Sequence, residues 1–456
     1  MPEPKPNPAL VTLLDGLRPA NLAFMALHPG DGPRRQPVHV VYGGGHLFRA
    51  ETAEKLGEVA RRALADHAPD PAALDQALGL GSLAEPVYFR VTEKLSRAPV
   101  EDFRIDFEDG YGTRPDAEED RDVAAAAREV AKGHAAGTLP EFIGIRVKPL
   151  NEELRARSLR TLRLFISTLL EAAGGLPPNF VITLPKVAFP EQVSVFAALL
   201  AALERELGLD AGVLRFEVMI ETPQVVLGTD GISALPRLIP AAAGRMQAAH
   251  FGTYDYTAAL GITAAHQRMR HPACDFAKHM MQVAYAGTGV WLSDGSTAIL
   301  PVPIHSTSSG SGPLTARQRA ENRDSVHAAW RLHADDVRHS LAGAFFQGWD
   351  LHPAQLVSRY AAVYEFFLTG LEAASERLRN FVSKAAQATL VGDAFDDAAT
   401  GQGLLNYFLR AVHAGAITED EAVRRSGLTL DELRGRSFVA ILKARGSAQG
   451  AGQLPR

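Results

Sequence analysis

The sequence predicts an α/β protein, a single (β/α)8 TIM barrel with a helical C-terminal extension. Short strand-like runs alternate with longer helical segments along most of the chain, which is typical of a parallel sheet covered by helices. Eight such units close a barrel of roughly 250 residues, and a chain of 456 residues leaves room for extensions. We therefore expect an N-terminal extension over 1–35, the barrel over 36–386 and a helical extension over 387–456.

The predicted strands are runs rich in β-branched and aromatic residues. In chain order they are Val38–Tyr42, Phe103–Phe107, Phe142–Val147, Phe180–Leu184, Arg215–Ile220, Ala248–Gly252, Gly289–Leu292 and Gly348–Leu351. The segments between them are rich in alanine, leucine and arginine with helical periodicity, and the clearest are Glu51–Ala65, Ala117–Ala136, Glu152–Ala173 and Glu191–Leu207.

Two segments do not follow the alternation. Ser306–Pro313 (STSSGSGP) directly follows the seventh strand and predicts a loop, either a plain surface linker or a mobile flap over the C-terminal face of the barrel. From Leu356 onward the sequence predicts only helix, with capping-box patterns that start at Thr418 and Thr429. We expect this tail to be accessory to the chemistry of the barrel.

Composition excludes several classes of protein. The 47 basic and 52 acidic residues give a net charge of −5, which argues against a nucleic-acid partner. A single cysteine, Cys274, excludes a disulfide framework and a cysteine-based zinc site. The first ten residues lack the features of a signal peptide, and the longest uninterrupted apolar run, Val195–Leu203, is shorter than a membrane span. We expect a soluble, cytoplasmic protein with no membrane partner.

Acidic residues gather at the end of the second predicted strand. Phe103–Asp109 (FRIDFED) alternates apolar with charged residues and ends in Glu108 and Asp109. A strand inside a barrel seldom carries three acids unless cations or donors satisfy them. These acids either pair with arginines beneath the site or belong to the site itself, and their position at the C-terminal end of a strand favours a functional role.

Two further carboxylates follow neighbouring strands. Glu221 follows the fifth strand in the segment IET, and Asp255 follows the sixth in FGTYD. Each alone could be a helix N-cap or a surface acid. Together they supply hard oxygen ligands at one rim with positions left open, which suits Mg²⁺ or Mn²⁺.

Two cationic residues follow the strands between these acids. Arg146 ends the third strand, where its guanidinium could grip a carboxylate and stabilise an enolate oxygen, or could neutralise the acids of the second strand. Lys186 follows the fourth strand and permits a rival hypothesis, the Schiff-base lysine of a metal-independent aldolase. Neighbouring carboxylates would keep this lysine protonated, which is the wrong state for a nucleophile.

The histidines are less informative. His327, His333 and His339 recur every six residues, which does not place them on one helical face, and we expect them to be solvated. His250 on the sixth strand is expected to be a core residue rather than a ligand. His352 follows the eighth strand and could hold in place a residue that contacts the substrate.

These motifs, in this order, resemble the HpcH/HpaI aldolase and citrate lyase β-subunit superfamily, of which malate synthase is a more distant relative. The matching segments are FEDG at 107–110, IRV at 145–147, LPK at 184–186, IET at 220–222, FGTYD at 251–255 and LHPAQ at 351–355. The resemblance implies a pyruvate- or phosphoenolpyruvate-binding barrel with Mg²⁺ on Glu221 and Asp255. It makes Arg146 the electrophilic residue and places Glu108 or Asp109 near the metal.

The resemblance implies a metal-dependent aldolase, a carbon–carbon lyase that acts through the enolate of a small, pyruvate-like 2-oxo acid. Gly252, Thr253, Lys186, His352 and Arg146 are expected to bind this substrate, and we expect a homo-oligomer. One alternative is a lyase or synthase of the Claisen type, with coenzyme A as a further cofactor, and another is a non-catalytic relative that binds a metabolite. The sequence departs from the family pattern at 110–112, at 256 and at 349–350, and these departures bear on the second substrate rather than on the metal site.

Overall fold

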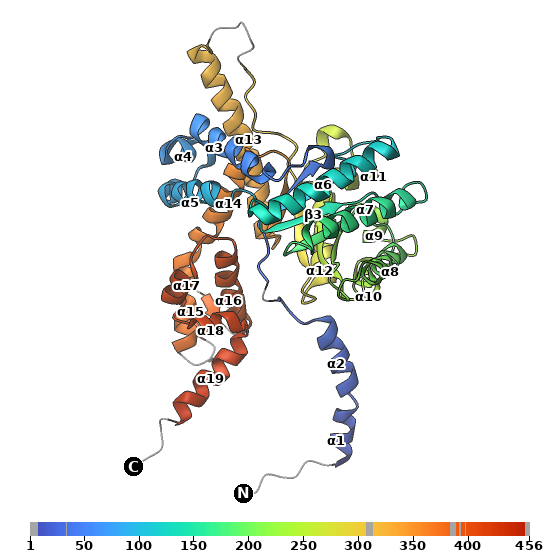
Figure 1. The fold of residues 1–456 in the computed structure, drawn as a ribbon. Helices are drawn as coiled ribbons and strands as arrows, with labels where there is room; N and C mark the ends of the chain where they lie inside the picture. Colours follow the sequence, from blue (N-terminus) through green and yellow to red (C-terminus); the bar gives the residue numbers. More distant parts are fainter. Residues whose placement is uncertain are drawn as a thin grey trace.

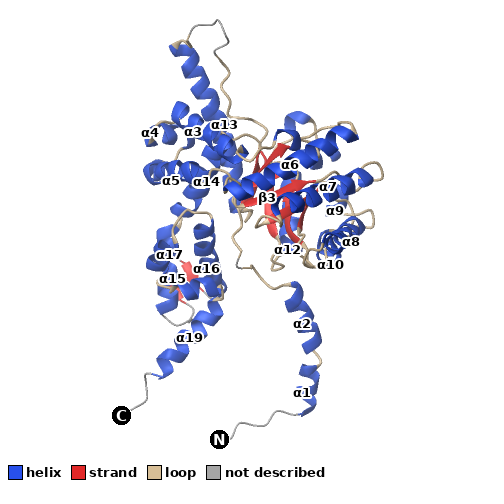
Figure 2. Ribbon diagram, viewed as in Figure 1, coloured by secondary structure: helices blue, strands red, loops and turns tan. Residues whose placement is uncertain are grey.

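The computed structural model describes residues 8–32, 34–306, 313–383, 389–391, 394–396 and 398–451. Eight parallel strands close into a barrel in the order in which they occur in the chain, which confirms the predicted fold class. They are β1 (His39–Gly44), β2 (Asp102–Asp106), β3 (Phe142–Arg146), β4 (Phe180–Leu184), β5 (Phe216–Ile220), β6 (Met246–Phe251), β7 (Trp291–Ser296) and β8 (Gln347–Asp350). Figure 2 shows these strands surrounded by helices.

The barrel strands follow the alternation seen in the sequence. On β2, Phe103 and Ile105 are buried in the apolar core, whereas Arg104 and Asp106 make ion pairs with residues of other barrel strands. The prediction differs most at β7, which was expected over 289–292 and runs over Trp291–Ser296. The predicted strand ends where polar residues begin, because polar residues are unusual in a buried strand. Asp294 nevertheless continues β7, since it is 1 % exposed and its carboxylate accepts a hydrogen bond of 3.1 Å from Lys278 Nζ.

Helices cover the barrel on its outside (Figure 1). Three of them, α3 (Thr52–His67), α4 (Pro71–Leu78) and α5 (Ala84–Arg97), lie between β1 and β2 in the chain. The others that follow barrel strands are α6 (Asp116–Ala136), α7 (Arg155–Ala173), α8 (Pro190–Leu207), α9 (Pro223–Val226), α10 (Leu235–Ala241), α11 (Thr253–Ala259), α12 (Pro272–Tyr285), α13 (Ala316–Ala342) and α14 (Gln355–Thr369). Of the predicted loop Ser306–Pro313, all but its first and last residues lies outside the described residues.

The C-terminal part of the chain forms a helical layer beside the barrel (Figure 1). Its elements are α15 (Leu371–Ser383), β9 (Thr389–Val391), β10 (Ala394–Asp396), α16 (Ala398–His413), α17 (Glu419–Ser426), α18 (Leu430–Gly435) and α19 (Phe438–Ala451). The prediction of helix alone is wrong at β9 and β10, which pair antiparallel, because three-residue strands are too short to leave a pattern. α15 packs on α16 and α17, so the helical layer includes residues before and after position 386. The predicted domain boundary at 386 therefore stays a prediction.

Both capping patterns of the tail are used at helix starts. Thr429 and Glu432 form the complete capping box of α18. At α17, Thr418 accepts a hydrogen bond from the backbone N–H of Glu421, but the carboxylate of Glu421 pairs with Arg425 instead of returning to the cap.

The N-terminal segment stands apart from the barrel as two short helices, α1 (Pro8–Asp15) and α2 (Arg18–Leu27) (Figure 1). No residue of α2 is buried. Within the described ranges, Ala9–Leu27 is the one helical stretch long and apolar enough to cross a membrane by length and composition, and 0 % of it is buried. The sequence pattern does not reveal this stretch because polar residues interrupt its apolar run. The absence of a membrane partner stays a prediction.

Of the three histidines on α13, which were expected to be solvated, His327 and His333 are buried. That prediction is wrong for these two. His333 is 1 % exposed, and its ring lies 3.0 Å from Asp350 Oδ1 and 2.8 Å from Ser358 Oγ. His327 is 6 % exposed and bonds to the carbonyl of His67, whereas His339 is half exposed beside Asp275. Periodicity failed here because α13 packs against α14, α4 and α3 on more than one side.

Candidate active site

Parallel strands bring the residues that follow them to one rim of the barrel, its C-terminal end. β2 ends in Asp106 and β3 in Arg146, while Lys186 and Glu221 follow β4 and β5 closely. Asp255 lies in the first turn of α11, directly after β6. The topology therefore gathers the predicted charged residues from neighbouring strands.

Lys186 lies at the centre of this cluster. Its Nζ is 2.5 Å from Glu108 Oε1, 3.1 Å from Asp109 Oδ2 and 3.5 Å from Asp255 Oδ2. Its backbone N–H donates a 2.7 Å hydrogen bond to Glu221 Oε1, and its φ of 51° is in the left-handed region. A non-glycine residue holds this conformation only where its surroundings require it. Here the ammonium and the N–H contact four carboxylates at once.

These contacts weigh against a Schiff-base role for Lys186. Burial opposes the charged ammonium, but Glu221, Glu108 and Asp109 outweigh burial and raise the pKa of Lys186 above its ordinary value. A lysine held in its protonated form has no lone pair with which to attack a carbonyl carbon.

Glu221 is the most buried carboxylate of the cluster that faces Lys186, with 2 % of its surface exposed. Burial, together with the charges of Asp255 and Glu108, raises the pKa of Glu221 to about 8, against the opposing effect of Lys186. Burial likewise raises the pKa of Glu108. The rim thus holds more negative charge than Lys186 and Arg146 neutralise, which is the condition that favours a further cation.

Gly252 provides the space that Glu221 occupies. A Cβ at Gly252 would lie 2.4 Å from Glu221 Oε2 and 2.5 Å from Glu221 Cβ. No ordinary contact is that short, so any side chain at position 252 must displace the Glu221 carboxylate.

We therefore expect Gly252→Ala to disable the site while the barrel still folds. Overpacking of this kind costs about 1–3 kcal/mol, and the displaced carboxylate can no longer meet a ligand. The measurement is divalent-cation binding by calorimetry, with melting temperature as the record of folding. Gly175→Ala is the matched control, because nothing lies within 4 Å of a Cβ there, and equal cation binding in the two variants would contradict the expectation.

Arg146 faces Asp106 with its planar fork. Its Nε and Nη2 donate to the two carboxylate oxygens of Asp106 at 2.7 and 2.5 Å, and its Nη1 is 3.0 Å from Glu108 Oε2. Burial opposes its charge, yet Asp106 and Glu108 raise the pKa of Arg146 well above its ordinary value. The neutralising role of Arg146 is therefore present in the structure, and Nη1 is the donor on the side of Glu108.

A second ion cluster lies deeper in the barrel. Arg104 donates to Asp102 Oδ2 at 3.0 Å and to Glu217 Oε2 at 2.8 Å. His250 Nε2 is 3.1 Å from the same Glu217 oxygen, and only 3 % of His250 is exposed. This confirms His250 as a core residue and shows that arginine and acids do pair beneath the rim.

Two aromatic residues that the sequence pattern does not single out lie beside Arg146. The guanidinium carbon lies 4.8 Å from the ring centre of Tyr42 and 5.5 Å from that of Trp349. The indole Nε1 of Trp349 is buried without a hydrogen-bond partner. Aromatic residues are ordinary in strands, so nothing in the sequence distinguished these two.

Two predicted substrate-binding residues differ in their surroundings. Thr253 is 2 % exposed, and its Oγ1 is buried without a hydrogen-bond partner. His352 uses Nδ1 to accept a hydrogen bond from the backbone N–H of Ala354. The described contacts of His352 stay within its own loop, so the structure does not join it to the carboxylate cluster.

A cavity of about 900 Å³ opens beside the cluster. Glu108, Asp109 and Lys186 form one side of it. Residues that follow β2 and β3 form the rest, including Arg114, Lys148, Arg157 and Arg160. The cavity is large enough for a substrate of metabolite size.

The donor set fits a hard divalent cation held by few protein ligands. Among the described residues, no group of three or more histidine, cysteine, aspartate or glutamate side chains converges as a closed metal site. Glu221 and Asp255 offer two carboxylates from adjacent strands, and Glu108 contacts the same Lys186 as they do. Two carboxylates with open positions match the way proteins bind Mg²⁺ rather than structural zinc.

Comparison with solved structures supports the fold. A citrate lyase from Burkholderia xenovorans is 20 % identical and aligns over 87 % of this chain and 98 % of its own, with a TM-score of 0.52. The protein CitE from Mycobacterium tuberculosis is 13 % identical over 87 % of this chain and 100 % of its own, with a TM-score of 0.46. A malate synthase from Haloferax volcanii is 15 % identical over 89 % and 99 %, with a TM-score of 0.44. The first of these shows that the chain shares the fold of a citrate lyase, which agrees with the fold that the resemblance implies.

No curated protein sequence matches the chain. One family model, described as a domain of unknown function (DUF6986), matches residues 17–441. Since that match spans the barrel and most of the helical layer, the chain belongs to the DUF6986 family.

Proposed function

We propose that this chain is an enzyme, a Mg²⁺-dependent carbon–carbon lyase that acts through the enolate of a small 2-oxo acid. The observation that carries the proposal is the charge cluster at the C-terminal end of the barrel. Glu221, Asp255 and Glu108 surround Lys186 there, and the buried Arg146 lies beside them. A protein that merely used this barrel as a scaffold would have no reason to bury carboxylates whose pKa values are raised.

In this proposal Glu221 and Asp255 hold the cation. Bound Mg²⁺ supplies Lewis-acid stabilisation for the negative charge that develops on a 2-oxo acid when a C–C bond breaks. Arg146 Nη1 donates to the same developing oxyanion, and Asp106 fixes the orientation of the guanidinium.

The proton moves through Glu108. In cleavage of a 4-hydroxy-2-oxo acid, the C3–C4 bond breaks and its electron pair passes into the enolate. The 4-hydroxyl proton goes to the Glu108 carboxylate, which leaves an aldehyde. Glu108 then returns the proton to C3 of the enolate. Burial raises the pKa of Glu108, which makes its carboxylate a stronger proton acceptor.

A second candidate is Claisen-type chemistry with an acyl-CoA. The cavity of about 900 Å³ favours it, because that volume lies at the upper end of the range for small-molecule sites and suits a ligand larger than pyruvate. The neighbour from Burkholderia xenovorans is described as a citrate lyase. The discriminating assay supplies the purified protein and Mg²⁺ either with short 4-hydroxy-2-oxo acids or with acyl-CoA and a 2-oxo acid. Pyruvate release supports the first function, thiol release supports the second, and neither product would support a non-catalytic protein.

We expect turnover to require a divalent cation and to survive borohydride in the presence of a 4-hydroxy-2-oxo acid. Carboxylates hold Lys186 in its protonated form, so no imine forms that borohydride could reduce. The measurements are activity after chelation and after Mg²⁺ is restored, and the intact mass after reduction. A reduced adduct located on Lys186 would replace the metal mechanism with Schiff-base chemistry.

Cation binding should depend on pH through Glu221. Because its pKa is raised to about 8, Glu221 is mostly protonated at neutral pH and must lose that proton to act as a ligand. Apparent Mg²⁺ affinity should therefore fall as pH drops below 8, by up to about tenfold per pH unit. Calorimetry at pH 7 in buffers of different ionisation enthalpy should show close to one proton released per cation, and no release would contradict the assignment.

A further inference from the structure

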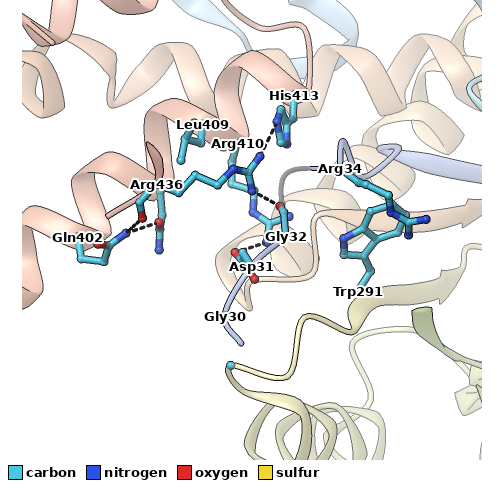
Figure 3. A pocket seen from close by; sticks show the side chains of 12 residues that line it. Gly30, Asp31, Gly32, Arg34, Trp291, Gln402, Leu409, Arg410, His413 and Arg436 are labelled. Carbon is cyan, nitrogen blue, oxygen red and sulfur yellow. Dashed lines mark hydrogen bonds and ion pairs between the residues drawn. The ribbon is translucent and has the colours of Figure 1, made fainter. Parts of the chain in front are cut away.

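The N-terminal arm, Ala9–Leu27, stands on a fixed base between the barrel and the helical layer. Just after the arm, the backbone N–H of Gly30 donates a 2.8 Å hydrogen bond to the carbonyl of Gly287, which precedes β7. Arg410 of α16 pairs with Asp31 at 3.0 Å, and Figure 3 shows this segment between Trp291 of the barrel and Arg410. From this base α1 and α2 extend away from both parts of the chain (Figure 1). The arm is therefore held out from the molecule by specific contacts at its base.

The arm exposes an apolar surface as large as one side of an interface. Every residue over 9–27 is exposed, and nine of them are large apolar residues with 38–72 % of their surface in solvent. These nine are Leu10, Val11, Leu13, Leu14, Leu17, Leu22, Phe24, Met25 and Leu27. Together they offer roughly 900 Å² of surface, about what one partner contributes to a standard protein–protein interface. Soluble monomers rarely expose an apolar patch of more than a few hundred Å² unless it binds something.

The two helices of the arm are too short to be stable alone. α1 has 8 residues and α2 has 10, whereas isolated helices shorter than about 12–15 residues are marginal in water. No residue of α2 is buried, and 0 % of the stretch Ala9–Leu27 is buried within the part of the chain that the structure describes. A surface from outside the chain therefore has to supply the packing that keeps the arm helical.

A membrane is the less suitable partner for this arm. A span needs about 20 predominantly apolar residues in one helix, but the arm is interrupted between α1 and α2, with Asp15 and Arg18 on either side of the break. Helices that lie on a membrane surface carry lysine and arginine along a polar face, and Arg18 is the one basic residue of the arm. The composition therefore favours a protein surface.

The charges of the arm are complementary to those of a second, antiparallel arm. Asp15 is the last residue of α1 and Arg18 the first of α2, so each charge opposes the dipole of its own helix. No ion pair joins either residue to a described part of the chain. When two arms cross antiparallel about a two-fold axis at the break, Asp15 of each lies opposite Arg18 of the other. The same alignment sets Val11 opposite Leu22, so apolar residues also meet apolar residues.

We propose that the arm binds the same arm of a second copy of this chain, antiparallel, with α1 of each copy packed on α2 of the other. The similar lengths of the two helices suit this exchange, and a two-fold contact uses the same surface on both copies. The arm leaves the molecule beside residues that precede β1 and β7, which places it at the N-terminal end of the barrel. The dimer therefore leaves the candidate active site at the opposite end open.

The test is sedimentation velocity on the full-length protein over a concentration series, with melting temperature as the record of folding. We expect a reversible dimer at micromolar concentrations. Asp15→Arg should weaken the dimer about tenfold or more, because it sets like charges opposite each other at both symmetry-related positions, and Arg18→Asp should do the same. The two changes combined in one chain should restore the dimer, since each arginine then faces an aspartate again. Asp66→Arg is the matched control, because Asp66 is an exposed aspartate of α3.

Flotation with vesicles of phosphatidylcholine and phosphatidylglycerol tests the membrane as the alternative partner, and the native chain should not float with them. Glu221→Gln should dimerise as the native chain does, so this proposal and the proposed enzyme function can fail separately. The proposal is overturned if the native chain is a monomer throughout the series or floats with the vesicles. It is also overturned if Asp15→Arg dimerises as tightly as the native chain, or if the combined variant dimerises as weakly as the single variants.

Discussion

Replacement of Glu221 by glutamine should abolish turnover and weaken Mg²⁺ binding more than about 100-fold. Mutation of a residue that only hydrogen-bonds to a metal ligand already lowers metal affinity roughly 10–100-fold, and loss of a ligand should cost more. The fold should survive. Glutamine keeps the oxygen that accepts the 2.7 Å hydrogen bond from the Lys186 backbone. It also resembles the protonated acid that predominates near neutral pH, since the pKa of Glu221 is raised to about 8. The measurements are kcat with saturating Mg²⁺, cation affinity by calorimetry and melting temperature in chelator.

The matched control is Glu171→Gln, an exposed carboxylate near the end of α7, which leads to the opposite end of the barrel. It removes the same charge far from the carboxylate cluster and should leave both cation affinity and turnover unchanged. The assignment of Glu221 fails if its glutamine variant binds Mg²⁺ as tightly as the native chain. Loss of turnover with intact binding would instead move Glu221 from cation ligand to proton carrier.

Arg146→Lys should lower turnover by roughly 10²–10³, the usual effect of removing one donor aimed at a developing oxyanion. Lysine keeps the positive charge that Asp106 and Glu108 require. It lacks the planar guanidinium, whose Nε and Nη2 bind Asp106 at 2.7 and 2.5 Å and whose Nη1 faces the site. Mg²⁺ affinity should change little. Turnover, cation affinity and melting temperature are measured at saturating Mg²⁺ and substrate.

Two comparisons separate a catalytic Arg146 from a purely structural one. Arg163→Lys is the control, because Arg163 is an exposed arginine that pairs with Glu206 and does not line the cavity beside the carboxylate cluster. If Arg146 only balances Asp106, the lysine variant will keep near-normal turnover, and Arg146→Ala will mainly lower the melting temperature by leaving buried carboxylates unpaired. That outcome would leave Arg146 as a structural residue.

Elements whose pattern repeats over several residues were predictable from the sequence. The eight barrel strands were found because branched and aromatic runs recur between amphipathic helices, and a closed parallel barrel is what such repetition builds. β7 was placed too early, since Asp294 and Ser296 are polar and their partners come from other elements. β9 and β10 were missed because each has three residues. His333 was misplaced because a helix packed on several sides has no single apolar face.

The sequence alone determined that Glu108, Arg146, Lys186, Glu221 and Asp255 meet at one rim, since the order of strands in a parallel barrel fixes where each strand end lies. It did not determine their partners. The tertiary structure decided that Asp106 holds the fork of Arg146, that Lys186 contacts the acids on either side of it, and that Trp349 lies beside them. It also decided that Arg436 donates a hydrogen bond to the carbonyl of Gly32, some 400 residues earlier in the chain. Partner choice depends on distances across the fold, and neither periodicity nor a local motif encodes those distances.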